Sequence, residues 1–279
     1  MRSTPRFEFG KNWQSFISSL TEERVREAER SLADMLRTGS LAGVSFLDIG
    51  SGSGLFSLAA RRLGARVVSF DYDPVSVACT LELKSRYFPG DLHWDVAEGS
   101  VLDREFLGSL GVFDIVYSWG VLHHTGELWK AMGNVQIPVR AGGVLFIAIY
   151  NDQGAASDLW AMTKRLYCSS VAGRVLVSAV MLPYFALRGV AAGLITSGSP
   201  FRHFTEYRTK RGMSVHHDWV DWLGGYPFEV ARPEQVLRFY GDAGFVLTNM
   251  IATRGSGCNQ YVFRRSLAER QARPASPPA

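Results

Sequence analysis

Cysteine is scarce in this 279-residue chain, and no export signal stands at its start. The three cysteines, Cys79, Cys168 and Cys258, lie far apart without a paired spacing. That pattern excludes a disulfide framework and a zinc site built from cysteines. Residues 1–5 lack the apolar core and the small-residue cleavage site of a secretion signal. We therefore expect a protein of the reducing cytoplasm.

A strong excess of charge of one sign is also missing. The net charge of +4 at pH 7 says nothing about the fold or the reaction. Basic and aromatic residues are not interleaved as in a nucleic-acid-binding module, so no nucleic-acid partner is expected. His203, His216, His217 and Asp218 come close in the sequence. Because adjacent histidines seldom point at one ion, no metal site is expected either.

Apolar runs alternate with stretches of helical periodicity through much of the chain. Strands are predicted at 44–49, 66–70, 92–97, 113–118 and 144–150, and helices at 55–63, 74–87 and 128–139. Near the end, a helix at 233–243 precedes strands at 245–253 and 258–264. Alternating strands and helices imply a parallel sheet with right-handed crossovers. We predict an α/β fold with a doubly wound, mostly parallel sheet, an antiparallel C-terminal hairpin and a helical insertion.

The same pattern divides the chain into segments. Residues 1–43 form a lead-in that contains a capped amphipathic helix after Thr21, and residues 44–150 form an α/β core. The stretch 151–232 is far longer than an ordinary connection and is predicted to be an inserted cap. Residues 233–265 complete the core. The tail, 266–279, is rich in small and charged residues without periodicity and is predicted to be disordered.

A glycine-rich loop joins the first predicted strand to the next helix. Gly50, Gly52 and Gly54 lack Cβ atoms, so the backbone can turn sharply and approach a ligand at a helix start that offers N–H donors. A dinucleotide fingerprint would need a sixth-position glycine, where this chain has Leu55. Asp71 follows the next strand, about twenty residues on, where a carboxylate can accept both hydroxyls of an adenosine ribose. A tight turn and a helix cap are the structural alternatives for the loop and for Asp71.

Three segments in this order resemble class I S-adenosylmethionine-dependent methyltransferases of the small-molecule type, similar to quinone-type O-methyltransferases. The segments are 47–54, with the sequence LDIGSGSG, 70–74, with the sequence FDYDP, and 113–116 through Leu122-His123-His124. The resemblance runs from about Val44 to Tyr150 and resumes at Pro233. It implies a Rossmann-like fold, S-adenosyl-L-methionine as cofactor and S-adenosyl-L-homocysteine as product.

The resemblance also implies which residues hold the cofactor. The glycine loop would wrap its methionine and ribose end, the acid after the second strand would hold the ribose, and the loop after the third strand would frame the adenine. The leading aromatic segment would lie over the site, or else pack at the sheet edge. The implied cofactor residues are Trp13, Asp48, Gly50, Ser51, Gly52, Gly54, Asp71, Tyr72, Ser100, Val101 and Trp119. In place of the family's Gly-Asp in the adenine loop, this chain has Gly99-Ser100.

Acceptor and catalytic residues are expected at the carboxyl ends of the fourth and fifth strands and in the cap. Methyl transfer needs positioning, and a base when the acceptor must lose a proton. The candidate catalytic residues are His124, Asp152 and His217, and the candidate acceptor contacts are Tyr150, Asn151, Gln153 and Tyr226. A histidine pair opening this helix is common in the family without being catalytic. Residues 151–153 fit a helix cap or turn equally well.

The cap contains a largely apolar stretch from Val171 to Ile195. Arg174, Pro183 and Arg188 interrupt it, and the uninterrupted parts are too short to span a bilayer of about 30 Å. The stretch is therefore predicted not to be a transmembrane helix. It is expected to contact a membrane interface, to line a lipophilic acceptor pocket, or to pack within the domain or in a homodimer.

The leading hypothesis is methylation of a small-molecule acceptor, at oxygen, with the cap selecting the acceptor. A nucleotide-dependent oxidoreductase is the enzymatic alternative, which Leu55 disfavours. A non-catalytic cofactor-binding module on the same fold is the third hypothesis.

Overall fold

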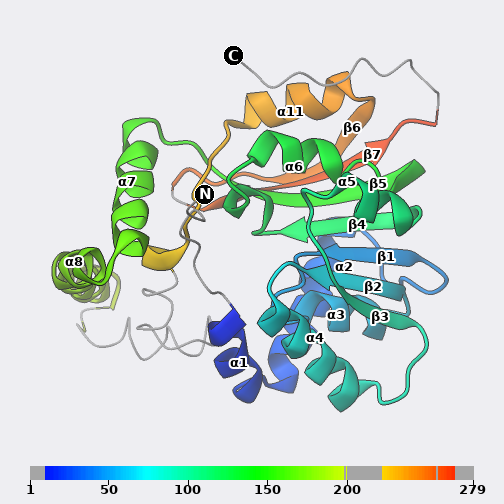
Figure 1. Cartoon of the computed structure of the whole chain (residues 1–279), viewed down its shortest axis with the longest axis horizontal. Coiled ribbons are helices and arrows are strands. Elements are labelled where there is room, and N and C mark those ends of the chain that lie inside the picture. The colour runs from blue at the N-terminus through cyan, green and yellow to red at the C-terminus, as the bar shows by residue number, and fades with distance from the viewer. Residues whose placement is uncertain (1–9, 198, 200–221, 256, 268–279) are drawn as a thin grey trace.

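The computed structural model describes residues 10–197, 199, 222–255 and 257–267, and its centre is a seven-stranded sheet (Figure 1). The strands are β1 (Ser45–Ile49), β2 (Arg66–Asp71), β3 (Trp94–Glu98), β4 (Phe113–Trp119), β5 (Val139–Tyr150), β6 (Phe245–Ile251) and β7 (Cys258–Arg265). Their order is β3-β2-β1-β4-β5-β7-β6. Strands β1 to β5 pair in parallel, whereas β7 runs antiparallel to both β5 and β6. The predicted fold class is therefore confirmed.

Helices cover both faces of this sheet (Figure 1). On one face lie α1 (Gly10–Ser18), α2 (Glu22–Leu36), α3 (Leu55–Arg62) and α4 (Pro74–Tyr87). On the other lie α5 (Arg104–Ser109), α6 (Leu128–Asn134) and α11 (Pro233–Asp242). Successive strand side chains point to opposite faces, so Phe46 belongs to the first layer while Leu47 and Ile49 belong to the second. The strands are consequently apolar on both sides.

The strand order fixes where a ligand can bind. The chain moves outward in one direction from β1 to β3 and in the other from β4 to β5. In such sheets the connections after neighbouring strands diverge at this switch point and leave a crevice at the carboxyl ends. Here the switch point lies between β1 and β4, so the loop after Ile49 and the loop after Trp119 border the same crevice.

The part of the chain between β5 and α11 contains α7 (Ala155–Ser169) and α8 (Val171–Ser197), which pack against each other beside the carboxyl ends of the strands (Figure 1). Gly173 makes their close approach possible, because a Cβ there would lie 2.2 Å from the carbonyl oxygen of Leu166. Tyr167, Val177 and Leu223 form a small apolar cluster between them.

Several element boundaries differ from the sequence prediction. Helix α6 ends at Asn134 and not at residue 139, and β5 already begins at Val139. Proline at 138 cannot donate a backbone hydrogen bond, which favours a break between the two elements. Helices α1 and α5 were not predicted. Thr21 occupies the position before α2, but its side chain makes no capping hydrogen bond; Glu22 and Glu23 in the first turn favour the helix instead.

The expectation about the apolar stretch in the cap is wrong in one respect. Helix α8 is continuous over 27 residues, through Arg174, Pro183 and Arg188. Its segment Val171–Ile195 is long and apolar enough, by length and composition, to cross a membrane, and it alone meets that test among the described residues. Whether it can cross also depends on the topology of the strands on either side of it.

Candidate cofactor and acceptor site

The glycine loop after β1 is held tightly against its neighbours. The backbone N–H groups of Gly50 and Ser51 both donate to the carbonyl of Phe70, at 2.8 and 3.0 Å. Gly50 has φ +75°, and a Cβ there would lie 2.5 Å from the side chain of Val121. The loop is thus squeezed between the end of β2 and the chain that leaves β4. Only a residue without a side chain fits that position.

Asp71 ties this loop to the end of β2. Its Oδ2 accepts a hydrogen bond from the Gly52 N–H at 2.9 Å, and its Oδ1 accepts one from the Asp73 N–H at 2.9 Å. Burial raises the pKa of this carboxyl above its ordinary value, while the backbone hydrogen bonds oppose that rise. An ionised carboxylate can accept about four hydrogen bonds, so part of its capacity remains for ribose hydroxyls. The geometry fits the role predicted from the sequence.

Asp48 lies beneath the loop. Its side chain is buried and accepts a hydrogen bond of 2.5 Å from Ser57 in α3. Ser57 also bonds to Ser69 at 2.7 Å, and Trp94 donates to Ser69 at 2.9 Å. This chain of contacts faces α3, so Asp48 supports the loop from the layer of helices. Contact between Asp48 and the cofactor stays a prediction.

Burial dominates the acid–base behaviour of Asp48. It raises the pKa of this carboxyl from 3.8 to about 7, with a further rise from the charge of Asp71 and an opposing effect from the Ser57 hydrogen bond. Near neutral pH the group is therefore close to half protonated. The charge beneath the glycine loop consequently depends on pH.

A first prediction uses this shift. Because the folded-state pKa is raised, the folded protein holds the proton more tightly than the unfolded chain, and stability falls as pH rises from about 4 to about 7. We expect Asp48→Asn to remove this loss while keeping an oxygen that accepts from Ser57. Relative to the parent protein, the variant should gain about 2–3 kcal/mol in unfolding free energy between about pH 5 and about pH 8. Urea unfolding at the two pH values measures the gain.

The control for this prediction is Asp103→Asn, which changes a carboxylate that caps α5. Other groups that titrate in the same pH range, such as His124, are present in both the variant and the parent protein. Their contributions to the unfolding free energy therefore cancel in the difference between the two. A constant difference between Asp48→Asn and the parent across the pH range would show that Asp48 is ionised throughout.

Helix α1 covers the loop from above. Trp13 lies against Gly52, since a Cβ at Gly52 would be 3.1 Å from Cε2 and Nε1 of the indole. The helix is fixed by a hydrogen bond of 3.0 Å from the Gly10 N–H to the Asp73 carboxylate. Of the two aromatic residues predicted to contact the cofactor here, Trp13 is placed at the loop, whereas Tyr72 is 62% exposed.

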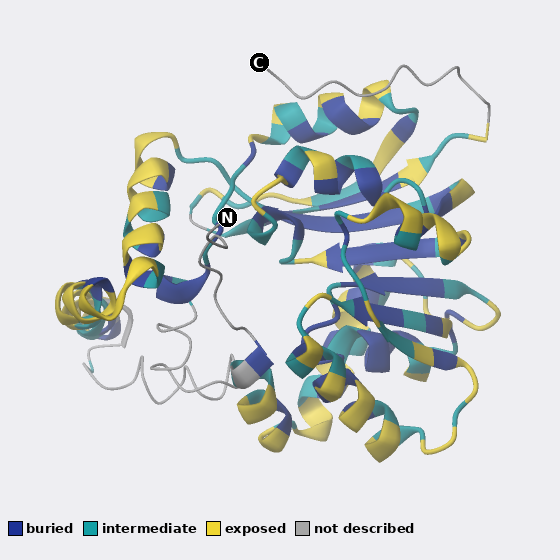
Figure 2. Ribbon diagram, viewed as in Figure 1, coloured by how far each residue is buried: buried dark blue, intermediate teal, exposed yellow. Residues whose placement is uncertain are grey.

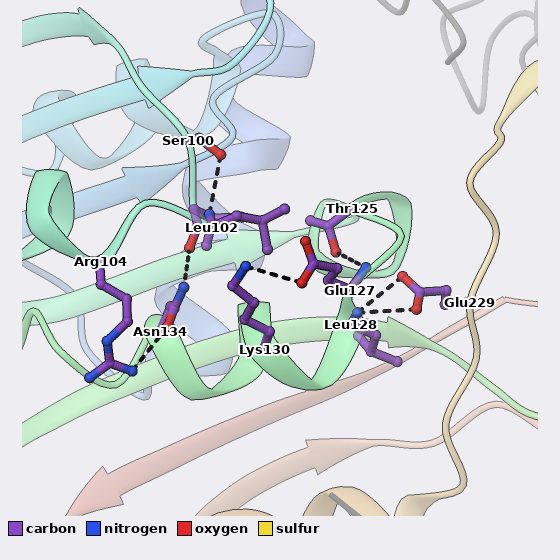
Figure 3. A network of polar contacts seen from close by, with 10 residues as sticks. Ser100, Leu102, Arg104, Thr125, Glu127, Leu128, Lys130, Asn134 and Glu229 are labelled. Carbon is purple, nitrogen blue, oxygen red and sulfur yellow. Dashed lines mark hydrogen bonds and ion pairs between the residues drawn. The ribbon is translucent and has the colours of Figure 1, made fainter. Parts of the chain in front are cut away.

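The loop after β3 is fixed by polar contacts that Figure 3 shows. The Ser100 hydroxyl accepts from the Leu102 N–H at 3.2 Å, and Asn134 donates to the carbonyl of Val101 at 3.0 Å. The Val101 side chain belongs to the core, so any contact it makes with an adenine is through its backbone. Gly99 lies beside Asp71, because its N–H donates to the Asp71 carbonyl at 3.0 Å. The candidate ribose and adenine residues are therefore neighbours.

The chain that leaves β4 brings the histidine pair to the crevice. His124 Nδ1 lies 2.7 Å from the carbonyl oxygen of Pro227, and because a carbonyl only accepts, this nitrogen carries the proton. Burial, helped by the charge of Lys164 and opposed by the hydrogen bond to Pro227, lowers the pKa of His124 to about 4. His124 is thus neutral at pH 7 and a weak base. His123 is buried, with its ring centroid 4.0 Å from that of Tyr150, and Trp119 is 42% exposed.

The polar residues after β5 have structural partners. The Asn151 amide donates to the Thr253 carbonyl at 3.4 Å and accepts from Asn259 at 3.1 Å. Asp152 accepts from the Gly154 N–H at 2.8 Å, and its other oxygen is 3.7 Å from Arg232 Nε. These contacts are those of a turn that anchors the cap to the hairpin. The acceptor roles of both residues stay predictions.

The remaining candidates are spread over the base of the cap. Gln153 and Tyr150 line a cavity of about 10 Å³, enough for about one water molecule, together with Trp160, Trp222 and Phe228. Tyr226 is half-buried in the segment that leads to Phe228. His217 lies outside the described residues. A larger cavity of about 440 Å³ lies near the amino end of β5, beside Arg140 and Arg264. That is the opposite end of the sheet from the crevice.

Two charged residues beside the crevice, Lys164 and Glu229, were not among the predicted site residues. Lys164 in α7 is buried, donates to the Trp222 carbonyl, and lies 4.2 Å from the centroid of the Trp222 ring and 5.0 Å from that of Phe228. Glu229 accepts from the Leu128 N–H through both oxygens, each at 3.1 Å, and so holds the start of α6 (Figure 3). The Lys164–Trp222 and Glu229–Leu128 contacts each join residues more than fifty positions apart, so no local sequence pattern predicts them.

Comparisons with known sequences agree with this geometry. Residues 47–147 match the family model of a methyltransferase domain. A ubiquinone biosynthesis O-methyltransferase of Methylobacterium sp. (strain 4-46) is 30% identical over 119 residues, 42% of this chain and 45% of that protein. One of Rhizobium etli (strain CIAT 652) is 32% identical over 120 residues, 43% of this chain and 46% of that protein. A tRNA U34 carboxymethyltransferase of Methylococcus capsulatus (strain ATCC 33009 / NCIMB 11132 / Bath) is 31% identical over 116 residues, 42% of this chain and 35% of that protein.

Solved structures share the fold. Magnesium protoporphyrin IX methyltransferase from Synechocystis PCC 6803, with bound S-adenosylhomocysteine, has a TM-score of 0.51 at 15% identity, over 87% of this chain and 84% of that chain. An O-methyltransferase family protein from Burkholderia thailandensis has a TM-score of 0.54 at 14% identity, over 88% and 58% of the two chains. The fold is thus that of Rossmann-like methyltransferases.

The matched domain extends from β1 to β5 and contains the glycine loop, Asp71 and the histidine pair. Residues 47–147 are therefore a methyltransferase domain on a Rossmann-like fold, in line with the resemblance of their motifs to class I S-adenosylmethionine-dependent methyltransferases. The chain spans about half the length of the ubiquinone relatives that it matches.

Proposed function

We propose that this protein transfers a methyl group from S-adenosyl-L-methionine to an oxygen of a small-molecule acceptor and releases S-adenosyl-L-homocysteine. The arrangement around Asp71 carries the proposal: the carboxylate holds the Gly52 N–H and keeps capacity to accept further hydrogen bonds at the crevice between β1 and β4. A Cβ at Gly52 would lie 3.1 Å from the Trp13 indole, so the glycine lets α1 close directly over the loop.

The bound cofactor would supply an electrophilic methyl group on its sulfonium. This chain's residues would bind and orient it: Asp71 through the ribose, and the loop after β3 around the adenine. The proposed base is one of His124, Asp152 and His217. His124 has the correct neutral form, with Nδ1 protonated, but a pKa of about 4 gives it little driving force to remove a hydroxyl proton. Orientation of the acceptor is therefore the role we assign to it.

The acceptor is proposed to be lipophilic. Ubiquinone biosynthesis O-methyltransferases are among the relatives, which supports both oxygen as the methylated atom and an apolar acceptor. The base of the cap is aromatic where it meets the core: the Tyr150 and Phe228 ring centroids are 5.1 Å apart, and those of Trp160 and Trp222 are 4.1 Å apart. Aromatic walls with polar edges both pack against and orient a ring-shaped ligand. A cytoplasmic location, suited to its separated thiols, is part of the proposal.

A screen of acceptors with an isotope-labelled methyl donor tests this function directly. Quinols and other phenols should accept label, whereas tRNA, included because of the carboxymethyltransferase relative, should not. A parallel thermal-shift measurement separates the alternatives: S-adenosylhomocysteine should raise Tm, and NAD should not. An oxidoreductase would give the reverse, and a non-catalytic module would bind S-adenosylhomocysteine without labelling any acceptor.

The second prediction concerns the cap, whose chain leaves the sheet at the carboxyl end of β5, beside the crevice. If this region holds the acceptor, Asp152→Asn and His217→Ala should each lower kcat/KM for the acceptor about tenfold or more while leaving the Kd for S-adenosylhomocysteine within about twofold. Steady-state kinetics and calorimetry on each variant measure the two quantities. Full activity per folded molecule in both variants would reject the cap as the acceptor site. The control, Asp158→Asn, changes an exposed carboxylate on α7.

A further inference from the structure

The outer side of the α7–α8 pair is apolar. Along α8, large apolar side chains at spacings of three, four and seven residues share one side of the helix: Leu176, Val180, Tyr184, Leu187 and Leu194. Each is about half or more exposed, with Leu187 at 70%. In α7 the same spacing exposes Leu159, Met162 and Leu166. Figure 2 shows exposed positions along the sides of both helices that are turned away from the sheet.

Few residues of α8 are packed. Val177 belongs to the cluster shared with α7, and Gly173 and Gly189 are also buried. Over the whole apolar segment, the most hydrophobic part is only 12% buried. Soluble monomers seldom leave a contiguous apolar surface of this length in contact with water, so such a surface marks an interaction site.

The charges beside the apolar stripe are almost all positive. Between residues 155 and 197 the chain has Lys164, Arg165, Arg174 and Arg188 but a single acid, Asp158. The three arginines are exposed. A second copy of this surface would set arginines against arginines with too few carboxylates to pair them. An anionic surface with an apolar interior is the complementary partner.

Topology decides how α8 can meet such a surface. Strand β5 precedes α7, and β7, which pairs with β5, follows α8 in the sequence. If α8 alone crossed a bilayer, two paired strands of one sheet would lie on opposite sides of the membrane. The sequence of residues 198–232 contains charged residues throughout and offers no second apolar span. Helix α8 must therefore remain on one side.

We propose that the α7–α8 surface docks this protein on an anionic lipid bilayer, with α8 in the plane of the interface. Leu176, Val180, Leu187 and their neighbours enter the acyl region, and Arg174 and Arg188 reach the headgroups. This inference stands on exposure, charge and topology and does not depend on methyl transfer. It does bring the mouth of the crevice, from which the cap leaves, close to the layer where a lipophilic acceptor would dissolve.

Co-sedimentation of the full chain with lipid vesicles tests the proposal. We expect binding to vesicles of equal parts phosphatidylcholine and phosphatidylglycerol, and weaker binding to phosphatidylcholine alone. Val180→Glu combined with Leu187→Glu should lower the affinity about tenfold or more on both, because two buried apolar contacts are lost. Arg174→Glu combined with Arg188→Glu should lower it about tenfold or more on the anionic vesicles only, since each arginine contributes about fivefold.

Matched controls carry the same changes elsewhere. Leu92→Glu replaces a leucine that is 88% exposed near β3, and Arg66→Glu replaces an exposed arginine at the start of β2. Both should bind vesicles like the parent protein, and all variants should keep their affinity for S-adenosylhomocysteine, which shows that they are folded. The proposal is overturned if the parent protein binds neither vesicle or if the α8 variants bind like the parent. It is also overturned if sedimentation velocity reveals a dimer that Val180→Glu with Leu187→Glu dissociates.

Discussion

Asp71→Ala is expected to weaken binding of S-adenosylhomocysteine about a hundredfold or more. Two hydrogen bonds from ribose hydroxyls to a charged carboxylate contribute about 1.5–3 kcal/mol each, so their loss removes at least about 3 kcal/mol. The variant also strips the Gly52 N–H and the Asp73 N–H of their partner. The loop that should cradle the cofactor is therefore loosened as well, and the true loss should exceed the ribose contribution. Isothermal calorimetry measures it.

The control for Asp71 is a carboxylate with similar local chemistry in another place. Asp103 accepts from the N–H groups of Glu105 and Phe106 at the start of α5, each at 3.0 Å. Asp103→Ala should lower the unfolding free energy by about 1 kcal/mol and leave affinity unchanged. Unchanged affinity in Asp71→Ala would mean that the ribose is not held at the end of β2, and the proposed orientation of the cofactor would be wrong.

The strands were predictable because the signal is local and repeated. Strands β1, β2 and β4 are short apolar runs that end at or just before a glycine or an aspartate, and Pro74 following Asp73 marks the start of α4 at the residue where the helix begins. The end of α6 could not be predicted from the sequence. The apolar residues after Asn134 continue the helical spacing, although Pro138 prevents the helix from continuing. Helix α1 escaped prediction because its stability comes from contacts with α4 and Gly52 and not from its own sequence.

In the site, too, residues in local motifs could be predicted, whereas residues placed by the tertiary fold could not. Gly50, Gly52 and Asp71 could be proposed as site residues because they belong to a motif of fixed spacing, and the structure brings them together. Lys164 was not found, since its environment is created by Trp222 and Phe228, which reach it only through the tertiary fold. Composition also could not reveal which side of α8 faces water. The sequence of an apolar helix is similar whether the helix lies in the core or on the surface. Only the exposure of its side chains in the structure distinguishes the two cases.

Gly52→Val is expected to abolish detectable binding of S-adenosylhomocysteine and to destabilise the fold. At φ +55° a β-branched residue is strained, at about 1–2 kcal/mol. The new Cβ would also lie 3.1 Å from the Trp13 indole, with two methyl groups beyond it, so α1 must shift or detach. The cofactor is proposed to lie between this loop and α1, so those methyl groups would also occupy part of its place. Calorimetry for the ligand and urea unfolding for stability measure the two effects.

Gly43→Val separates backbone strain from crowding. Gly43 has φ +77°, but a Cβ there would meet nothing within 4 Å. This control should lose stability by about the same 1–2 kcal/mol and keep full affinity. Adding Trp13→Ala to Gly52→Val then distinguishes the two consequences of crowding. Room for the valine should restore part of the lost stability, because the indole no longer has to move, yet affinity should stay lost if the side chain itself occupies the cofactor's place. Recovery of binding in the double variant would show instead that Gly52 acts only by letting α1 close over the loop.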